Sequence, residues 1–116
     1  MRVHLFSTGS HTARAFRYLK RSRRYELAVW ESDDPVRAAI DVTDCEEDDF
    51  LYVEVTGYRS DELVSIARRL RRSARCPFGF VHAGNDMEDT PRLFFAGASD
   101  FLGRAVLERG LTVKRM

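Results

Sequence analysis

The sequence has few cysteines and no long apolar run. Its two cysteines, Cys45 and Cys76, form neither a CxxC pair nor a Cys/His spacing typical of a metal site, so we expect reduced thiols and no metal. No stretch of about 18 consecutive apolar residues is present, so we expect no membrane span. The opening residues, MRVHLFSTGS, are too short and too polar for a signal peptide, and we therefore expect a cytoplasmic protein.

Lysine is also scarce, because only Lys20 and Lys114 interrupt an otherwise all-arginine set of 19 basic residues. The net charge is only +1, so the chain as a whole is not a polyelectrolyte. Hydrophobic residues make up 44% and charged residues 32%, which is typical of a globular protein. The length of 116 residues suits a single domain, which we place over residues 1–116.

Short apolar runs alternate with helical patterns along the chain. Strands are expected at residues 2–7, 25–30, 50–55 and 77–83. The run 50–55, FLYVEV, is the most continuous and suits a central parallel strand. Alternation of this kind predicts a parallel sheet with helices on both faces, and functional loops at the carboxyl ends of the strands.

Three helices are expected between these strands. The first begins at a Ser10 cap, the second has Asp34 as N-cap with Pro35 at the first helical position, and the third begins at a Ser60 cap. The third has the strongest apolar stripe, formed by Leu63, Ile66, Ala67, Leu70 and Ala74. Acidic residues follow the second helix in a loop, 44–49.

The last third of the chain fits two patterns. In one, residues 91–97 form a short helix, Phe101 and Leu102 belong to a short fifth strand, and the tail is a stub of helix. In the other, residues 92–96 form a strand, Ser99 caps a helix over 100–109 that ends at Gly110, and 111–114 form a last strand.

The segment 97–104, GASDFLGR, resembles the Gly-Ala-Asp-Asp-Tyr-Leu-x-Lys segment of response-regulator receiver domains. The preceding strands match that family in order and spacing. The resemblance implies an α/β, flavodoxin-like (receiver-like) three-layer sandwich with a central parallel five-stranded sheet of order 2-1-3-4-5. It also favours the helix-then-strand pattern for the last third.

The residues that carry the family's phosphorylation chemistry differ in this chain. The resemblance places the Mg²⁺-binding acidic pair at Ser7 and Thr8, and the phosphoacceptor aspartate at Glu54. It places the conserved hydroxyl residue after the fourth strand at His82 and the invariant lysine at Arg104. These five residues form the predicted degenerate phosphoacceptor pocket.

The chemistry of these replacements argues against phosphorylation. Phosphoryl transfer to a carboxylate needs Mg²⁺, and Mg²⁺ prefers carboxylate and other hard oxygen ligands. Only Glu54 of the three carboxylates is left, and it is one methylene longer than aspartate. We therefore expect no cofactor, no metal and no enzymatic activity. Two interpretations of Glu54 stay open. It forms a bidentate ion pair with Arg104 that holds the domain in one state, or it is a solvated carboxylate.

We expect the chain to act as a phosphorylation-independent signalling and protein-interaction module, through a protein partner or a homodimer. Leu93, Phe94, Phe95 and Phe101 are either core residues or an interface.

Two other functions stay open. One is a small flavodoxin-like enzyme or ligand-binding protein that uses the turn 7–10 and the edge 82–86, where His82, Glu54 and Asp86 would make a polar cluster. The other is nucleic-acid binding through the arginine-rich helix ends 17–24 and 68–75. His4 lies inside a strand, and we expect it to be a packed, at least half-buried residue.

Overall fold

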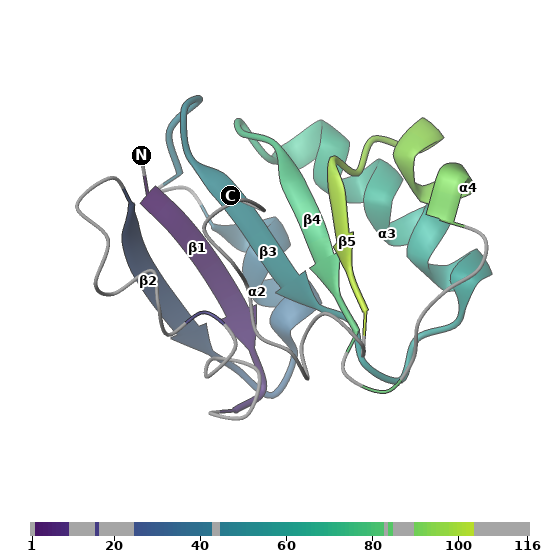
Figure 1. Cartoon of the computed structure of the whole chain (residues 1–116), viewed down its shortest axis with the longest axis horizontal. Helices are drawn as coiled ribbons and strands as arrows, with labels where there is room; N and C mark the ends of the chain where they lie inside the picture. The colour runs from purple at the N-terminus through teal and green to yellow at the C-terminus, as the bar shows by residue number, and fades with distance from the viewer. Residues whose placement is uncertain are drawn as a thin grey trace.

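Five parallel strands form one sheet in the part of the chain that the computed structural model describes, namely residues 2–9, 16, 25–42, 45–82, 84 and 90–103. The strands are β1 (Arg2–Ser7), β2 (Glu26–Glu31), β3 (Phe50–Glu54), β4 (Phe78–Val81) and β5 (Asp100–Leu102). Their order is β2-β1-β3-β4-β5, and every neighbouring pair is parallel (Figure 1). The predicted fold and strand order are therefore confirmed.

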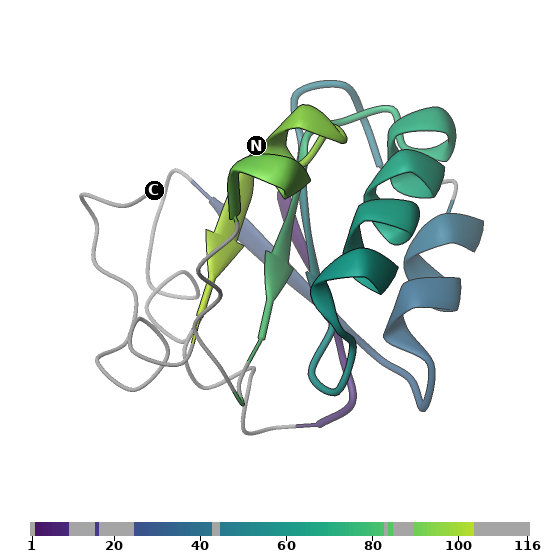
Figure 2. The same ribbon diagram turned by 90° about the vertical axis from the view of Figure 1, so that its right-hand side faces the viewer.

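Three helices, α2 (Pro35–Asp41), α3 (Ser60–Ser73) and α4 (Thr90–Phe95), lie on one face of this sheet (Figure 2). Their apolar residues pack with alternate strand residues into the larger core cluster, which includes Phe6, Val53, Phe80, Leu63 and Leu93. The opposite sheet face carries a smaller cluster with Val3, Leu5, Tyr52 and Val81, to which Phe16 contributes. Apart from Phe16, the expected first helix lies outside the described residues, and so does the tail after residue 103.

Helix α2 begins as its sequence predicts. Asp34 is the N-cap, and its side chain accepts a hydrogen bond from the Arg37 amide at 3.2 Å. Pro35 follows at the first turn, where its missing N–H removes no helical hydrogen bond.

Helix α3 differs from prediction at its first residue. Arg59, not Ser60, is the N-cap, and the Glu62 carboxylate accepts a hydrogen bond from the Arg59 amide. This acceptor at the third helical position satisfies an amide at the helix start, so a serine cap is not needed. The predicted stripe is confirmed at Leu63, Ile66, Ala67 and Leu70, which are all buried. Its last member, Ala74, is the C-cap after the helix and is only partly buried.

The last third follows the helix-then-strand pattern, and the strand-then-helix alternative is wrong for the described residues. Gly97 ends α4 at a φ of +123°, a conformation that favours glycine. Its amide donates to the Phe94 carbonyl, and the Ala98 amide donates to the Leu93 carbonyl. These two bonds are a Schellman motif, which ends the helix just before β5.

Among the described residues, no helix is both long enough and apolar enough to cross a membrane.

Candidate functional site

The carboxyl ends of β1 and β3 bring Ser7 and Glu54 together. The two strands are neighbours, with Phe6 paired to Val53, so the next residue of each lies at the same edge of the sheet. Ser7 is fully buried, and Glu54 is 8% exposed. A buried carboxylate is costly unless hydrogen-bond donors surround it, so the contacts of Glu54 decide what this site can do.

Both oxygens of the Glu54 carboxylate accept hydrogen bonds from the turn after β1. The Thr8 amide donates to Oε1 at 3.2 Å, and the Thr8 hydroxyl donates to Oε2 at 3.0 Å. The Ser7 hydroxyl lies 2.9 Å from Oε1 and 2.8 Å from the Gly9 carbonyl, so its single hydrogen is shared between these two acceptors. The turn is held further by the Gly9 amide, which donates to the Ser7 hydroxyl at 3.1 Å. The carboxylate is thus enclosed by hydroxyl and amide donors.

These residues do not fit the Mg²⁺ ion that the receiver fold implies. The ion needs several anionic or carbonyl oxygens around it, whereas Ser7 and Thr8 direct hydroxyl and amide hydrogens at Glu54. In the described part of the chain, no three His, Cys, Asp or Glu side chains gather where they could share a metal ion. Glu54 is the one carboxylate placed by β1 and β3 at this point.

His82 follows β4 and is 8% exposed. Its backbone amide donates to the Leu102 carbonyl at 2.9 Å, which fixes the residue beside β5. Its ring atom Nδ1 is buried and has no hydrogen-bond partner among the residues that the structure describes. The ring lies close to Gly84, as does the Thr56 side chain. The other members proposed around it, Asp86 and Arg104, lie outside the described residues.

A second buried polar group, centred on His4 and Asp49, was not predicted as a unit. His4 is fully buried, as expected, and its Nε2 lies 3.1 Å from Asp49 Oδ2. The Trp30 indole N–H donates to His4 Nδ1 at 3.2 Å, so Nε2 carries the hydrogen that bonds Asp49. Asp49 thus turns inward from the acidic loop.

The environment of Asp49 keeps it ionised. Burial acts to raise its pKa, but the hydrogen bonds from the Glu46 amide, the His4 ring and the Arg2 amide outweigh this, and the pKa lies below its ordinary value of 3.8. His4 and Asp49 are 45 residues apart in the chain, and no local motif in the sequence links them. The pair ties the start of β3 to β1 at the edge opposite to Glu54.

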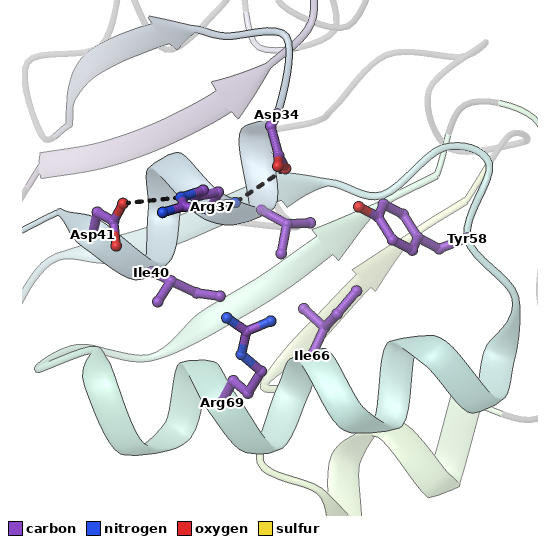
Figure 3. A pocket seen from close by; sticks show the side chains of 8 residues that line it. Asp34, Arg37, Ile40, Asp41, Tyr58, Ile66 and Arg69 are labelled. Atoms are coloured by element: carbon purple, nitrogen blue, oxygen red, sulfur yellow. Dashed lines mark hydrogen bonds and ion pairs between the residues drawn. The ribbon is translucent and has the colours of Figure 1, made fainter.

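A hollow of about 330 Å³ lies between α2 and α3 (Figure 3), and Glu54 does not line it. Val36, Ile40, Ile66 and Tyr58 supply its apolar wall, and the Arg37–Asp41 ion pair, Asp34 and Arg69 supply charges of both signs at its rim. The Arg69 side chain extends from α3 between Ile40 and Ile66. None of the predicted site residues that the structure describes lines this hollow.

The apolar residues of α4 and β5 divide into core and surface. Leu93 is fully buried, and Phe101 is half-buried against the larger core cluster. Phe94 is 45% exposed and Phe95 is 88% exposed. Leu93 and Phe101 are therefore core residues, whereas an interface at Phe94 and Phe95 stays a prediction.

Comparisons with known proteins give the fold class. No family model matches the chain, and no curated protein matches it. Among solved structures, a CpaE2 pilus assembly protein from Sinorhizobium meliloti superposes with a TM-score of 0.73 at 17% identity, over 91% of this chain and 89% of the other. The pilus assembly protein CpaE from Caulobacter crescentus has a TM-score of 0.71 at 19% identity, over 90% and 88%.

A response regulator from Thermotoga maritima is also similar, with a TM-score of 0.64 at 18% identity, over 98% of this chain and 94% of the other. At sequence identities this low, the superpositions establish a shared fold. The chain therefore has the fold of response-regulator receivers and of the CpaE structures, as the resemblance of segment 97–104 implies.

Proposed function

We propose that this chain is a receiver-like signalling module that works without phosphorylation and acts by contacting another protein chain. The observation that carries the proposal is the Glu54 carboxylate, whose two oxygens accept hydrogen bonds from Ser7 and Thr8. This position is where the resemblance places the phosphoacceptor. A carboxylate bonded in this way is a weaker nucleophile, because the hydrogen bonds stabilise its negative charge.

The loss of metal ligands supports the same conclusion. A phosphoryl group carries negative charge that must be neutralised as it approaches a carboxylate. In phosphoryl transfer, Mg²⁺ supplies the positive charge that neutralises it. Ser7 and Thr8 are neutral, so the turn after β1 brings no charge to hold that ion. The hydrogen-bonded Glu54 therefore acts as a fixed structural group that holds the turn in one conformation.

The exposed aromatic residues of α4 supply a surface for protein contact. Phe95 is 88% exposed and stands beside Phe94, which is 45% exposed. Aromatic residues are enriched at protein interfaces, where they bury a large area with few rotatable bonds. The buried Leu93 anchors the same helix turn to the core, so the two rings are presented from a fixed support.

Intact-mass measurement tests the absence of phosphorylation. The protein is incubated with Mg²⁺ and acetyl phosphate beside a phosphorylatable receiver as positive control. We expect the control to gain about 80 Da, the mass of one phosphoryl group, and this chain to gain nothing. A stable adduct on Glu54 would overturn the proposal.

A second candidate places the module in pilus assembly, because the CpaE structures are described as pilus assembly proteins. In this case the module would act as the receiver-like part of such an apparatus. Deleting the gene in the source organism and counting surface pili by electron microscopy tests this candidate. We expect fewer pili, and unchanged piliation would count against it.

A further inference from the structure

The single tryptophan of the chain, Trp30, is hydrogen-bonded to a buried histidine. Its indole N–H donates to Nδ1 of His4 at 3.2 Å, and Nε2 of the same ring lies 3.1 Å from Oδ2 of Asp49. Trp30 lies on β2, the first strand in the sheet order, and is 37% exposed, whereas His4 is fully buried. The His4 ring therefore connects a buried carboxylate with a side chain that reaches the surface.

These two contacts require the neutral form of the His4 ring. An indole N–H can only donate, so Nδ1 accepts with its lone pair and carries no hydrogen. Nε2 then carries the single ring hydrogen and donates it to Asp49, which is anionic at neutral pH because its pKa lies below 3.8. The observed arrangement thus holds an uncharged imidazole between a donor and an acceptor.

A second proton on His4 is incompatible with the bond to Trp30. It would bind at Nδ1, the ring nitrogen without a hydrogen, and would point at the indole hydrogen. Two donors that face each other at this distance repel. The bond from Nε2 to Asp49 would become stronger, because donor and acceptor would then both carry charge. Protonation therefore keeps the contact with Asp49 and breaks the contact with Trp30.

Asp49 is the charged side chain that bonds the His4 ring within the described residues. Other titratable side chains on the elements around the ring form ion pairs elsewhere, lie exposed or are buried thiols: Arg2 with Glu26, Arg37 with Asp41, the acidic residues 46–48, Cys45 and Cys76. A change in the charge of His4 therefore acts directly on two described neighbours, Asp49 and Trp30.

We propose that His4 is a proton-operated switch for Trp30. The neutral ring holds the indole N–H at the outer strand β2, and the protonated ring releases it to solvent. Trp30 also packs on Phe6, with ring centroids 5.7 Å apart and planes inclined by 8°, so the indole can turn its N–H toward water while the fold persists. The switch changes an exposed part of the sheet in response to acid. It is independent of the proposed function, because neither Glu54 nor the aromatic residues of α4 take part.

The test uses the whole chain, with Trp30 as reporter because no other tryptophan contributes to the emission. Tryptophan fluorescence, far-UV circular dichroism and proton–nitrogen NMR spectra are recorded from about pH 8 to about pH 5, the range in which histidine gains a proton. At the upper end, the ring nitrogens of His4 should show a hydrogen on Nε2 and none on Nδ1. On acidification we expect emission at longer wavelength and faster exchange of the indole N–H with water, while the circular dichroism stays constant.

Three variants assign the response to its residues. His4→Gln removes the titrating ring, and its Trp30 emission should not depend on pH in this range. His82→Gln, at a second buried histidine that follows β4, is the matched control and should keep the response. Asp49→Asn removes the anionic partner of the protonated ring, so the midpoint of the response should fall by about 1–3 pH units.

The wild-type NMR measurement decides the proposal even if a variant folds poorly. The ring nitrogens of His4 and the indole N–H of Trp30 should titrate with one midpoint, because one proton controls both. Different midpoints, an indole signal that does not change, or a change that coincides with loss of the circular dichroism would overturn the proposal. A pH response that persists in folded His4→Gln would do the same.

Discussion

The Ser7 hydroxyl oxygen lies 2.9 Å from Oε1 of Glu54, although the two residues are 47 positions apart in the chain. The contact exists because β1 and β3 are parallel neighbours that end at the same edge. Thr8 adds its amide and hydroxyl to the same carboxylate, so a two-residue turn encloses it.

Glu54→Gln should destabilise the protein by about 1–3 kcal/mol. The new amide nitrogen would face the hydrogen donors of Ser7 and Thr8, and a buried polar group without its partner costs that much. Glu47→Gln is the matched control, because Glu47 is exposed, and its effect should stay within about 0.5 kcal/mol. Urea unfolding of the three proteins measures the difference. Equal stability of wild type and Glu54→Gln would contradict this account.

Ser7→Asp combined with Thr8→Asp should create a response to Mg²⁺ that the wild type lacks. The double variant places three carboxylates together, so it should be less stable than wild type without metal. Millimolar Mg²⁺ should raise its Tm in a concentration-dependent way, because the ion binds only the folded state. Thermal unfolding at several Mg²⁺ concentrations tests both proteins. A wild-type Tm that rises with Mg²⁺ to the same extent would show that the native residues already hold the ion.

Asp49→Asn should remove a pH-dependent part of the stability. The folded pKa of Asp49 lies below 3.8, so its ionised form stabilises the fold above this pH, and the contribution is lost as pH falls through the folded pKa. At neutral pH the variant should be less stable by about 1–3 kcal/mol, since its amide nitrogen would face the N–H donors of Arg2, Glu46 or His4. The gap to wild type should narrow below pH 3.8. Asp48→Asn, at an exposed neighbouring position, should show neither effect.

Phe95→Ser should change association without changing stability. Phe95 is 88% exposed, so its loss should alter the free energy of unfolding by less than about 0.5 kcal/mol. Leu93→Ala, two residues earlier and fully buried, should cost about 2–5 kcal/mol. Sedimentation velocity of wild type and Phe95→Ser tests whether a second copy uses this surface. If both sediment alike as monomers, the surface serves a different protein.

Gly79→Ala should destabilise the sheet by about 1–3 kcal/mol. A Cβ at this position would lie 3.0 Å from Asp100 Cβ and 3.0 Å from Tyr52 Cε1. The glycine lets the Tyr52 hydroxyl pass across β4 and donate to Asp100 Oδ2 at 2.8 Å. Gly84→Ala is the matched control, because its nearest contact would be an ordinary 3.5 Å. Equal denaturation midpoints for the two variants would contradict this role of Gly79.

Local patterns predict much of this fold because they report local physics. The apolar run at 50–55 contains β3, the Asp34-Pro35 pair begins α2, and the stripe from Leu63 to Leu70 faces the core. These features depend on side chains a few residues apart. The last third was ambiguous because a helix over 100–109 and a strand at 100–102 are both compatible with its local signals. Contact with β4 and the Schellman motif at Gly97 decide for the strand.

The sequence by itself determined the class of fold, the start of α2 at Asp34 and Pro35, and the neutral residues Ser7 and Thr8 at the end of the first strand. Only the tertiary structure decided that these hydroxyls surround Glu54 and that Asp49 turns inward to His4. Each of these pairs joins residues more than 30 positions apart. Their contact depends on which strands become neighbours and where they end, because the parallel sheet brings separate chain segments to a common edge.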